Sequence, residues 1–207
     1  MTQPIDVWRG EFGDEYTERN AADETALHRR TRMWARWLDC FGTREPASIL
    51  EVGCNLGLNL RALRRLTDAR LMAVEPNAGA IRRVIEDGVA DEDSVREGVG
   101  EAIPFPDGAA ELVFTAGVLI HVPPDNLPAV ADEMHRVSSR FILVSEYFAS
   151  EPEEKRYRGQ DGLLFKRDFA GFFLDRFDDL EVVADGFLWK RTTGIDDTTW
   201  ALMEKRG

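Results

Sequence analysis

Cysteine and histidine are scarce in this sequence. Its 207 residues include two cysteines, Cys40 and Cys54, and three separated histidines, His28, His121 and His135. Two cysteines cannot build a disulfide framework, and isolated histidines do not reproduce the ligand spacing of a zinc site. The sequence therefore predicts a chain without a bound metal.

Long apolar runs and an excess of cationic residues are also absent. No stretch reaches the roughly 20 apolar residues that a membrane-spanning helix needs, and residues 1–10 lack the apolar core of a secretory signal. The formal net charge is −12, which disfavours sequence-independent binding to DNA or RNA, because that binding needs clustered Lys and Arg against phosphates. We expect a cytoplasmic protein whose partner is a small molecule, neither a membrane nor a nucleic acid. The oligomeric state stays open.

The remaining composition is typical of a globular domain. Hydrophobic residues make up 43% of the chain and charged residues 31%, and the length allows one domain with a full hydrophobic core. We predict a single domain over residues 1–207. Within it, residues 1–41 form an N-terminal helical lid and a helix, and residues 42–207 form the core.

Strands and helices alternate along the sequence. Helical spacing of apolar residues predicts a helix over 23–41. Short apolar runs predict strands at 48–52, 70–75, 95–99, 110–116 and 141–145, and an antiparallel edge hairpin is predicted at 181–189 and 198–204. Further helices are predicted from about Gly57, from Pro76 to about Asp87, over 125–137 and over 166–176. This alternation indicates an α/β fold with a doubly wound, mostly parallel sheet.

Two segments lack a regular pattern. Residues 1–22 mix aromatic, polar and charged side chains, and we interpret them as a lid that folds over a pocket. A surface helix packed on the body is the alternative. Residues 151–162 are polar without an apolar period, which predicts a long irregular insert of functional or mobile character.

The most informative segment is residues 49–58 (ILEVGCNLGL), an apolar strand that runs into a glycine-containing turn and a helix. The next predicted strand ends in Glu75, about 20 residues further on. This order describes a nucleotide-type pocket at the carboxyl end of a parallel sheet. The glycines allow backbone to approach a ligand closely, the helix N-terminus offers N–H groups, and Glu75 can accept hydrogen bonds from both ribose hydroxyls.

The spacing within the turn distinguishes between ligands. A dinucleotide fingerprint needs G-x-G-x-x-G, and here Asn55 and Leu58 stand at its second and third glycine positions. The pattern E-x-G-x-N-x-G instead resembles motif I of class I S-adenosyl-L-methionine (SAM)-dependent methyltransferases. SAM has no pyrophosphate but carries a positive α-ammonium, which Glu51 and the turn carbonyls can hold. We therefore expect SAM rather than NAD.

Four motifs extend the resemblance over nearly the whole chain. They are residues 12–20 (FGDEYTERN), 51–57 (EVGCNLG), 117–121 (GVLIH) and 166–169 (KRDF). In this order they resemble the pseudaminic acid biosynthesis-associated methylases. The resemblance implies a seven-stranded, Rossmann-like class I methyltransferase sheet of order 3-2-1-4-5-7-6, and it implies methyl transfer by analogy. Where many related enzymes have an adenine-binding Asp, this chain has Val99 before Gly100 and Glu101.

Candidate SAM-binding residues follow from the motifs. They are Glu51, Gly53, Cys54, Asn55, Gly57, Glu75, Pro76, Asn77, Val99, Gly100, Thr115, Gly117 and Arg19. Cys54 is expected to contribute backbone only. Asn77 either faces the adenine edge or caps its helix. Val99 and Gly100 would hold adenine through backbone. The carboxylate of SAM would pair with Arg19 or with an arginine of the cluster Arg29, Arg30 and Arg32.

Candidate catalytic residues are His121, Tyr16 and Asn20. His121 is either a general base or a packed histidine that donates to backbone. Tyr16 offers an aromatic face to the sulfonium. We expect His135 to be solvated. Polar residues of mixed charge flank the polar insert and would suit a small polar or anionic acceptor. They are Glu146, Tyr147, Tyr157, Arg158, Lys166 and Arg167.

Three functions are compatible with these residues. The first is methylation of an N or O atom in the biosynthesis of a small polar metabolite, such as an amino sugar or a sugar nucleotide. The second is a SAM-consuming cyclase or lyase on the same fold, which closes SAM to azetidine-2-carboxylate and releases methylthioadenosine. The third is a SAM-binding sensor or partner subunit without turnover.

Overall fold

The computed structural model describes residues 8, 10, 13, 15, 17 and 23–206. The chain divides into two compact units, Met1–Pro104 and Phe105–Gly207, and each is described by itself. The single domain over 1–207 stays a prediction. Tyr16, Arg19 and Asn20 of the expected lid lie outside the described residues.

The first unit is a parallel three-stranded segment with helices between the strands. Its elements are α3 (Glu24–Asp39), β1 (Ser48–Val52), α4 (Leu58–Leu63), β2 (Arg70–Glu75), α5 (Ala78–Glu86), the short 3-10 helix η1 (Glu92–Ser94) and β3 (Val95–Glu97). β1 pairs with β2, and β2 pairs with β3, all in parallel. β1 and β2 are almost fully buried, as their continuous apolar runs predict.

Helix α3 shows how local signals and packing agree. Asp23 caps its N-terminus by accepting from the backbone N–H of Ala26 at 2.7 Å. One apolar stripe of the helix is buried, and in it the rings of Trp34 and Trp37 meet edge to face at 5.0 Å between centroids. The helix predicted over 23–41 is thereby confirmed, with its ends shortened by one or two residues.

The second unit combines parallel and antiparallel strands. Its elements are β4 (Ala110–Ala116), η2 (Leu119–His121), α6 (Leu127–Val137), β5 (Ser138–Glu146), β6 (Glu153–Tyr157), β7 (Gln160–Lys166), α7 (Phe169–Arg176), β8 (Leu180–Leu188), α8 (Lys190–Thr193) and β9 (Thr198–Lys205). β4 and β5 are parallel, whereas β9 runs antiparallel to both β5 and β8. The predicted C-terminal hairpin is confirmed.

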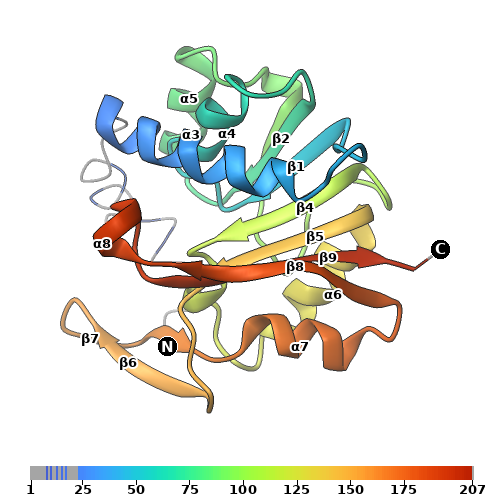
Figure 1. The fold of residues 1–207 in the computed structure, drawn as a ribbon. Coiled ribbons are helices and arrows are strands. Elements are labelled where there is room, and N and C mark those ends of the chain that lie inside the picture. Colours follow the sequence, from blue (N-terminus) through green and yellow to red (C-terminus); the bar gives the residue numbers. More distant parts are fainter. Residues whose placement is uncertain are drawn as a thin grey trace. The chain divides into compact units, whose positions relative to one another are not determined.

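The seven-stranded sheet has the order β3-β2-β1-β4-β5-β9-β8 (Figure 1). When the separate β6–β7 pair is left out of the numbering, β8 and β9 become strands six and seven. The order is then 3-2-1-4-5-7-6, as the resemblance implied. The predicted fold class is therefore confirmed. Within the described ranges, no helix combines the length and the apolar character needed to cross a membrane.

The irregular insert expected at residues 151–162 was a wrong prediction. This segment forms most of an antiparallel hairpin of β6 and β7, which projects from the rest of its unit in Figure 1. Arg158 (φ 51°) and Gly159 (φ 82°) turn the chain in the left-handed region, as a two-residue hairpin turn requires. The pattern was missed because β6 has charged residues on both faces and so shows no alternation of apolar and polar residues.

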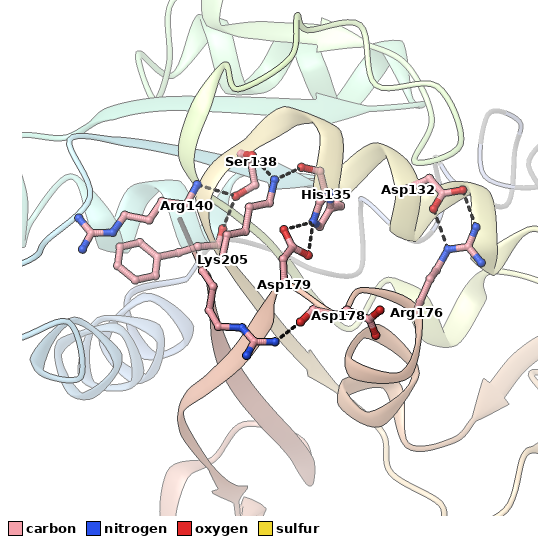
Figure 2. A network of polar contacts seen from close by, with 10 residues as sticks. Asp132, His135, Ser138, Arg140, Arg176, Asp178, Asp179 and Lys205 are labelled. Carbon is pink, nitrogen blue, oxygen red and sulfur yellow. Dashed lines mark hydrogen bonds and ion pairs between the residues drawn. The ribbon is translucent and has the colours of Figure 1, made fainter.

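The expected solvation of His135 was also wrong. Its ring stacks on Phe177 at 4.1 Å between centroids, and its Nε2 lies 3.0 Å from both carboxylate oxygens of Asp179. Figure 2 shows this pair beside Lys205, whose Nζ donates to the carbonyls of His135 and Ser138. The lysine thus satisfies carbonyl groups at the end of α6, where a helix leaves them unpaired.

Capping residues explain the shifted helix starts. The helix expected to open at Pro76 begins at Ala78, because Asn77 accepts from the Ala80 N–H at 2.9 Å. The helix expected from residue 166 begins at Phe169, because Asp168 caps it. A side chain that accepts an N–H of the first turn marks the boundary more sharply than apolar spacing does.

Candidate functional site

The turn after β1 has a backbone that few residues can adopt. Gly53 (φ 78°), Asn55 (φ 45°) and Gly57 (φ 66°) all lie in the left-handed region. A Cβ at Gly57 would also stand 3.2 Å from Cγ1 of Val89. Glycine relieves both constraints, and asparagine tolerates the left-handed region better than most residues. The motif therefore encodes a turn that curls tightly between strand and helix.

Glu51 places a carboxylate under this turn. Its side chain is 2% exposed, and its Oε1 accepts from Asn59 Nδ2 at 2.6 Å. Asn59 in turn accepts from Trp34 Nε1 at 3.2 Å. Oε2 is buried and has no hydrogen-bond partner among the described residues. Burial raises the pKa of Glu51 to about 8, although the bond from Asn59 and the charge of Arg30 oppose the rise.

A buried polar atom without a partner needs an explanation. The free energy lost by leaving such an atom unsatisfied is about 1–3 kcal/mol, and it is larger for a charged group. A donor supplied by a ligand would recover that loss, and a cationic donor would also stabilise the carboxylate form. Glu51 therefore fits the α-ammonium of an amino-acid moiety.

Glu75 ends β2 and is held by the backbone of the same region. It is 7% exposed. Its Oε2 accepts from the N–H of Asn55 at 2.8 Å, and its Oε1 accepts from the N–H of Asn77 at 3.0 Å. Burial raises its pKa, while these two bonds act against the rise. Each oxygen retains capacity for a further donor, which suits a pair of vicinal hydroxyl groups.

Asn55 and Asn77 make contacts that define their roles in the turn. Thr17 Oγ1 donates to Asn55 Oδ1 at 2.9 Å, so the N-terminal segment reaches the turn. Asn77 caps α5, which was one of its two predicted roles, and its Nδ2 donates to the carbonyl of Trp8 at 3.5 Å. Pro76, which directly precedes Asn77 in the chain, is half-buried.

Cys54 is buried in the turn. Burial raises the pKa of its thiol well above the ordinary value, and the charges of Glu75 and Glu51 raise it further. The thiol therefore stays protonated and is a poor nucleophile. The expectation that Cys54 contributes only backbone to a SAM site stays a prediction.

The candidate adenine segment forms a tight turn after β3. The amide of Ala102 donates to the carbonyl of Val99 at 3.2 Å, around half-buried Gly100. Gly98 precedes it, and a Cβ at this position would lie 2.8 Å from Cδ of Pro104. Sequence reasoning missed Gly98, whose absence of a side chain allows the close approach of Pro104.

In the second unit, Glu146 organises the loop after β4. It is buried at the end of β5 and accepts from the N–H groups of Val118 at 3.2 Å and Ile120 at 3.4 Å. Burial raises its pKa to about 7, against the effect of these bonds. Gly117 (φ 74°) opens the loop, and its N–H donates to Ser145. Thr115, just before it, is fully buried.

His121 is packed against the β6–β7 hairpin. Its Nδ1 lies 2.6 Å from the carbonyl oxygen of Leu163, and its ring lies 5.2 Å from that of Tyr157. Burial lowers its pKa to about 4, so the imidazole is neutral at physiological pH and Nδ1 carries the donated proton. This contact is the one that the packed-histidine alternative described. A catalytic role for His121 stays a prediction.

The residues expected around an acceptor are engaged with their neighbours. Tyr147 donates its hydroxyl to Asp196 Oδ2 at 3.0 Å, and Lys166 Nζ lies 5.5 Å from the centre of the Tyr147 ring. Arg167 lies over Phe172, 4.4 Å from its ring centre. Among the residues described, no three His, Cys, Asp or Glu side chains are grouped to hold a metal ion.

Comparison with known proteins shows which proteins part of this chain is similar to. Residues 50–140 match the family described as a methyltransferase domain. A sterol 24-C-methyltransferase of Aspergillus fumigatus is 26% identical over 129 residues, which cover 56% of this chain and 34% of that protein. A sterol 24-C-methyltransferase of Gibberella zeae is 25% identical over 170 residues, which cover 70% of this chain and 44% of that protein. The chain thus spans less than half the length of these curated relatives.

Solved structures establish the fold. The 1,6-didemethyltoxoflavin-N1-methyltransferase of Burkholderia thailandensis, bound to its substrate and S-adenosylhomocysteine, has a TM-score of 0.73 at 14% identity, covering 100% of this chain and 92% of that one. The magnesium protoporphyrin IX methyltransferase of Synechocystis PCC 6803, with S-adenosylhomocysteine, has a TM-score of 0.70 at 12% identity, covering 97% of each. The chain has the class I methyltransferase fold, and within it residues 50–140 are similar to the methyltransferase-domain family. SAM is the methyl donor of this class.

Proposed function

We propose that this protein is a SAM-dependent methyltransferase that acts on an N or O atom of a small polar metabolite. The observation that carries the proposal is the polar lining of the turn after β1. There a buried oxygen of Glu51 has no partner among the described residues, and Glu75 is fixed by two backbone N–H groups. An amino sugar or a sugar nucleotide is the acceptor suggested by the resemblance to pseudaminic acid-associated methylases.

Each part of SAM has a candidate partner in the first unit. Glu51 would hold the α-ammonium, and the backbone of Gly53–Gly57 would surround the methionine portion. Glu75 would accept from the ribose hydroxyls, and the backbone at Val99 and Gly100 would contact adenine. Pro76, Asn77 and Cys54 would complete the walls. Arg19, or an arginine of the cluster Arg29, Arg30 and Arg32, would pair with the carboxylate of SAM.

When bound, SAM supplies a methyl group that its sulfonium has already activated. The protein then has to align the donor and the acceptor and keep water away. Positioning of this kind can contribute about 7–11 kcal/mol to lowering the barrier. Tyr16 and Asn20 would cover the reacting centre, and Thr115 and Gly117 would border it at the end of β4.

A general base is required only if the acceptor is a hydroxyl or a protonated amine. His121 is a weak candidate, because its pKa is lowered to about 4. Its Nδ1 contact with Leu163 suits a role in holding the loop against the hairpin. Within the proposal, His121 therefore positions the loop, and an unprotonated amine would need no base.

The first test is to incubate the purified protein with SAM alone and with a panel of amino sugars and sugar nucleotides. Mass spectrometry should detect S-adenosylhomocysteine only when an acceptor is present. Methylthioadenosine with azetidine-2-carboxylate from SAM alone would replace the proposal with the cyclising reaction. SAM binding without any turnover would indicate a sensor. No contact in the described residues favours either alternative.

The donor site is tested by Glu75→Gln, which keeps the shape but removes two of the acceptor sites that a carboxylate provides. We expect SAM affinity to fall by roughly tenfold or more, since hydrogen bonds to a charged group contribute about 1.5–3 kcal/mol. Glu97→Gln is the matched control, because Glu97 is the register partner of Glu75 on β3 but is exposed. Equal affinities of the two variants would contradict the site.

A further inference from the structure

Three buried polar side chains from three elements of the first unit form one chain of hydrogen bonds. Trp34 of α3 donates its Nε1–H to Oδ1 of Asn59 on α4 at 3.2 Å, and Asn59 Nδ2 donates to Oε1 of Glu51 on β1 at 2.6 Å. Trp34 is fully buried, and Asn59 and Glu51 are 5% and 2% exposed. Burial keeps water from competing for these bonds and strengthens each of them.

The tryptophan decides which way the amide of Asn59 faces. An indole N–H can only donate, so the Asn59 atom beside it has to be the carbonyl oxygen. The amide nitrogen then faces Glu51, and it also can only donate. A reversed amide would set its own N–H groups against the N–H of Trp34, which is unfavourable because neither buried donor would have an acceptor.

The same logic determines where Glu51 carries its proton. Oε1 accepts from Asn59, so it is not the protonated oxygen in this arrangement. Oε2 is buried and has no hydrogen-bond partner among the described residues. The neutral side chain therefore carries its proton on Oε2, and the carboxylate offers its remaining lone pairs there. One oxygen is held by the protein, and the other is left to a proton or to a donor of a ligand.

Charged groups around Glu51 set how readily Oε2 gives up that proton. Arg30 on α3 favours the carboxylate, whereas Glu75 at the end of β2 disfavours it. The thiol of Cys54 is close enough for both carboxyl groups to raise its pKa, and it stays neutral. Burial has the largest effect and raises the pKa of Glu51 to about 8. The bond from Asn59 opposes burial, because it is stronger to a carboxylate than to a neutral acid.

We propose that Trp34 and Asn59 are positioning residues for Glu51, which hold Oε1 and make Oε2 the atom that exchanges its proton for the ammonium group of a ligand. Trp34 acts through Asn59, and Asn59 acts through Glu51, so neither residue has to touch the ligand. The identification of this ammonium with that of SAM rests on the proposed function. The placement of the proton on Oε2 does not.

NMR of isotope-labelled glutamate carboxyl groups in the ligand-free protein follows the titration of Glu51, and Glu51→Gln identifies its signal. Asn59→Leu removes the donor and should raise the midpoint by about 1–2 pH units, because the carboxylate loses a hydrogen bond. Trp34→Phe keeps an aromatic ring but removes the N–H, and it should raise the midpoint by about 0.5 pH unit or more. The double variant should titrate like Asn59→Leu alone, since Trp34 acts through Asn59.

Trp37→Phe is the matched control. Trp37 lies on the same helix, is equally buried and meets the ring of Trp34 edge to face, whereas the bonds of Asn59 go to Trp34 and Glu51. This variant should leave the midpoint of Glu51 unchanged. Equal midpoints for Trp34→Phe and Trp37→Phe would overturn the proposal, and so would a wild-type midpoint in Asn59→Leu. The tryptophan pair decides the matter by itself if Asn59→Leu does not fold.

Infrared spectroscopy locates the proton. The C=O stretch of a neutral carboxyl group falls in frequency when its carbonyl oxygen accepts a hydrogen bond. The acid-form band that disappears in Glu51→Gln should therefore have the lowered frequency in the wild-type protein, and it should rise in Asn59→Leu. A wild-type band at the frequency of an unbonded carbonyl would place the proton on Oε1 and refute the proposal.

The ligand is tested with S-adenosylhomocysteine and with its analogue in which hydrogen replaces the α-amino group. In calorimetry near pH 7, Asn59→Leu should weaken binding of S-adenosylhomocysteine by about tenfold or more, since less of Glu51 is ionised. The affinity for the analogue should stay nearly constant, a difference that a merely structural role would not produce. Equal losses for both ligands would refute the ammonium contact. If the titrations and the infrared bands follow the expectation but wild-type protein does not bind S-adenosylhomocysteine, the proposed function fails and the positioning of Glu51 stands.

Discussion

Replacing Glu51 with glutamine should remove the pH dependence of SAM binding and much of its strength. The pKa of Glu51 is raised to about 8 by burial, so most molecules carry a neutral side chain at pH 7. The α-ammonium of SAM would favour the carboxylate, and binding would then release a proton. SAM affinity should therefore rise as the pH increases from 6 towards 8.

The size of the change in SAM affinity with pH follows from the raised pKa of Glu51. Each pKa unit corresponds to about 1.36 kcal/mol, and two pH units below the pKa leave roughly 1% of the carboxyl groups ionised. The α-amino group of SAM begins to lose its own proton at about pH 7.7–8.0. Allowing for both, the wild-type affinity should change on the order of 30-fold between pH 6 and pH 8. In Glu51→Gln the change should be small and in the opposite direction.

Titration calorimetry measures both the affinity for SAM and the number of protons released on binding. At pH 7, in two buffers of different ionisation enthalpy, the wild-type protein should release close to one proton per SAM bound, and Glu51→Gln should release almost none. Glu97→Gln, an exposed glutamate on β3, controls for the loss of a charge. The reasoning is refuted if wild-type affinity does not depend on pH, or if Glu51→Gln keeps the wild-type slope.

Three further predictions concern stability. Burial raises the pKa of Glu51 to about 8 and that of Glu146 to about 7, from 4.5. The folded state therefore binds more protons than the unfolded state, and the free energy of unfolding should fall as the pH rises from 4.5 to 8. Urea denaturation of Glu51→Gln and Glu146→Gln should show a weaker dependence of this free energy on pH. Asp23→Ala should cost about 1 kcal/mol by removing the α3 cap, and unchanged thermal unfolding would contradict this. Gly186→Ala should cost about 1–3 kcal/mol, because its Cβ would lie 2.9 Å from Trp200 Nε1; an unaltered indole fluorescence spectrum would argue against the clash.

Much of the fold was readable from apolar runs. The strands at 48–52, 70–75 and 110–116 were predicted with the bounds that the structure shows. They are nearly continuous apolar segments, because both faces of such a strand are covered and no alternation competes with the signal. The β6–β7 hairpin was missed for the opposite reason, since charged side chains lie on both faces of β6 and hide the alternation that would mark a strand.

The contacts of the candidate sites were less predictable. The sequence indicated Glu51 and Glu75 by their positions at strand ends, but it did not indicate Asn59, which bonds to Glu51 and is eight residues away. Likewise His135 was expected in solvent and instead contacts Asp179, which is 44 residues away. Such partners carry no local pattern, because a long-range hydrogen bond leaves no periodicity in the chain.

The sequence by itself determined the succession of the strands of the seven-stranded sheet along the chain and the conformation of the turn, since apolar periodicity and glycine act over a few neighbouring residues. Only the tertiary structure decided which polar groups are removed from water and which partners they meet. It buried Glu51, Glu146 and His121 and thereby displaced their pKa values from the ordinary range. Desolvation depends on everything packed around a group, and that surrounding comes from distant parts of the chain.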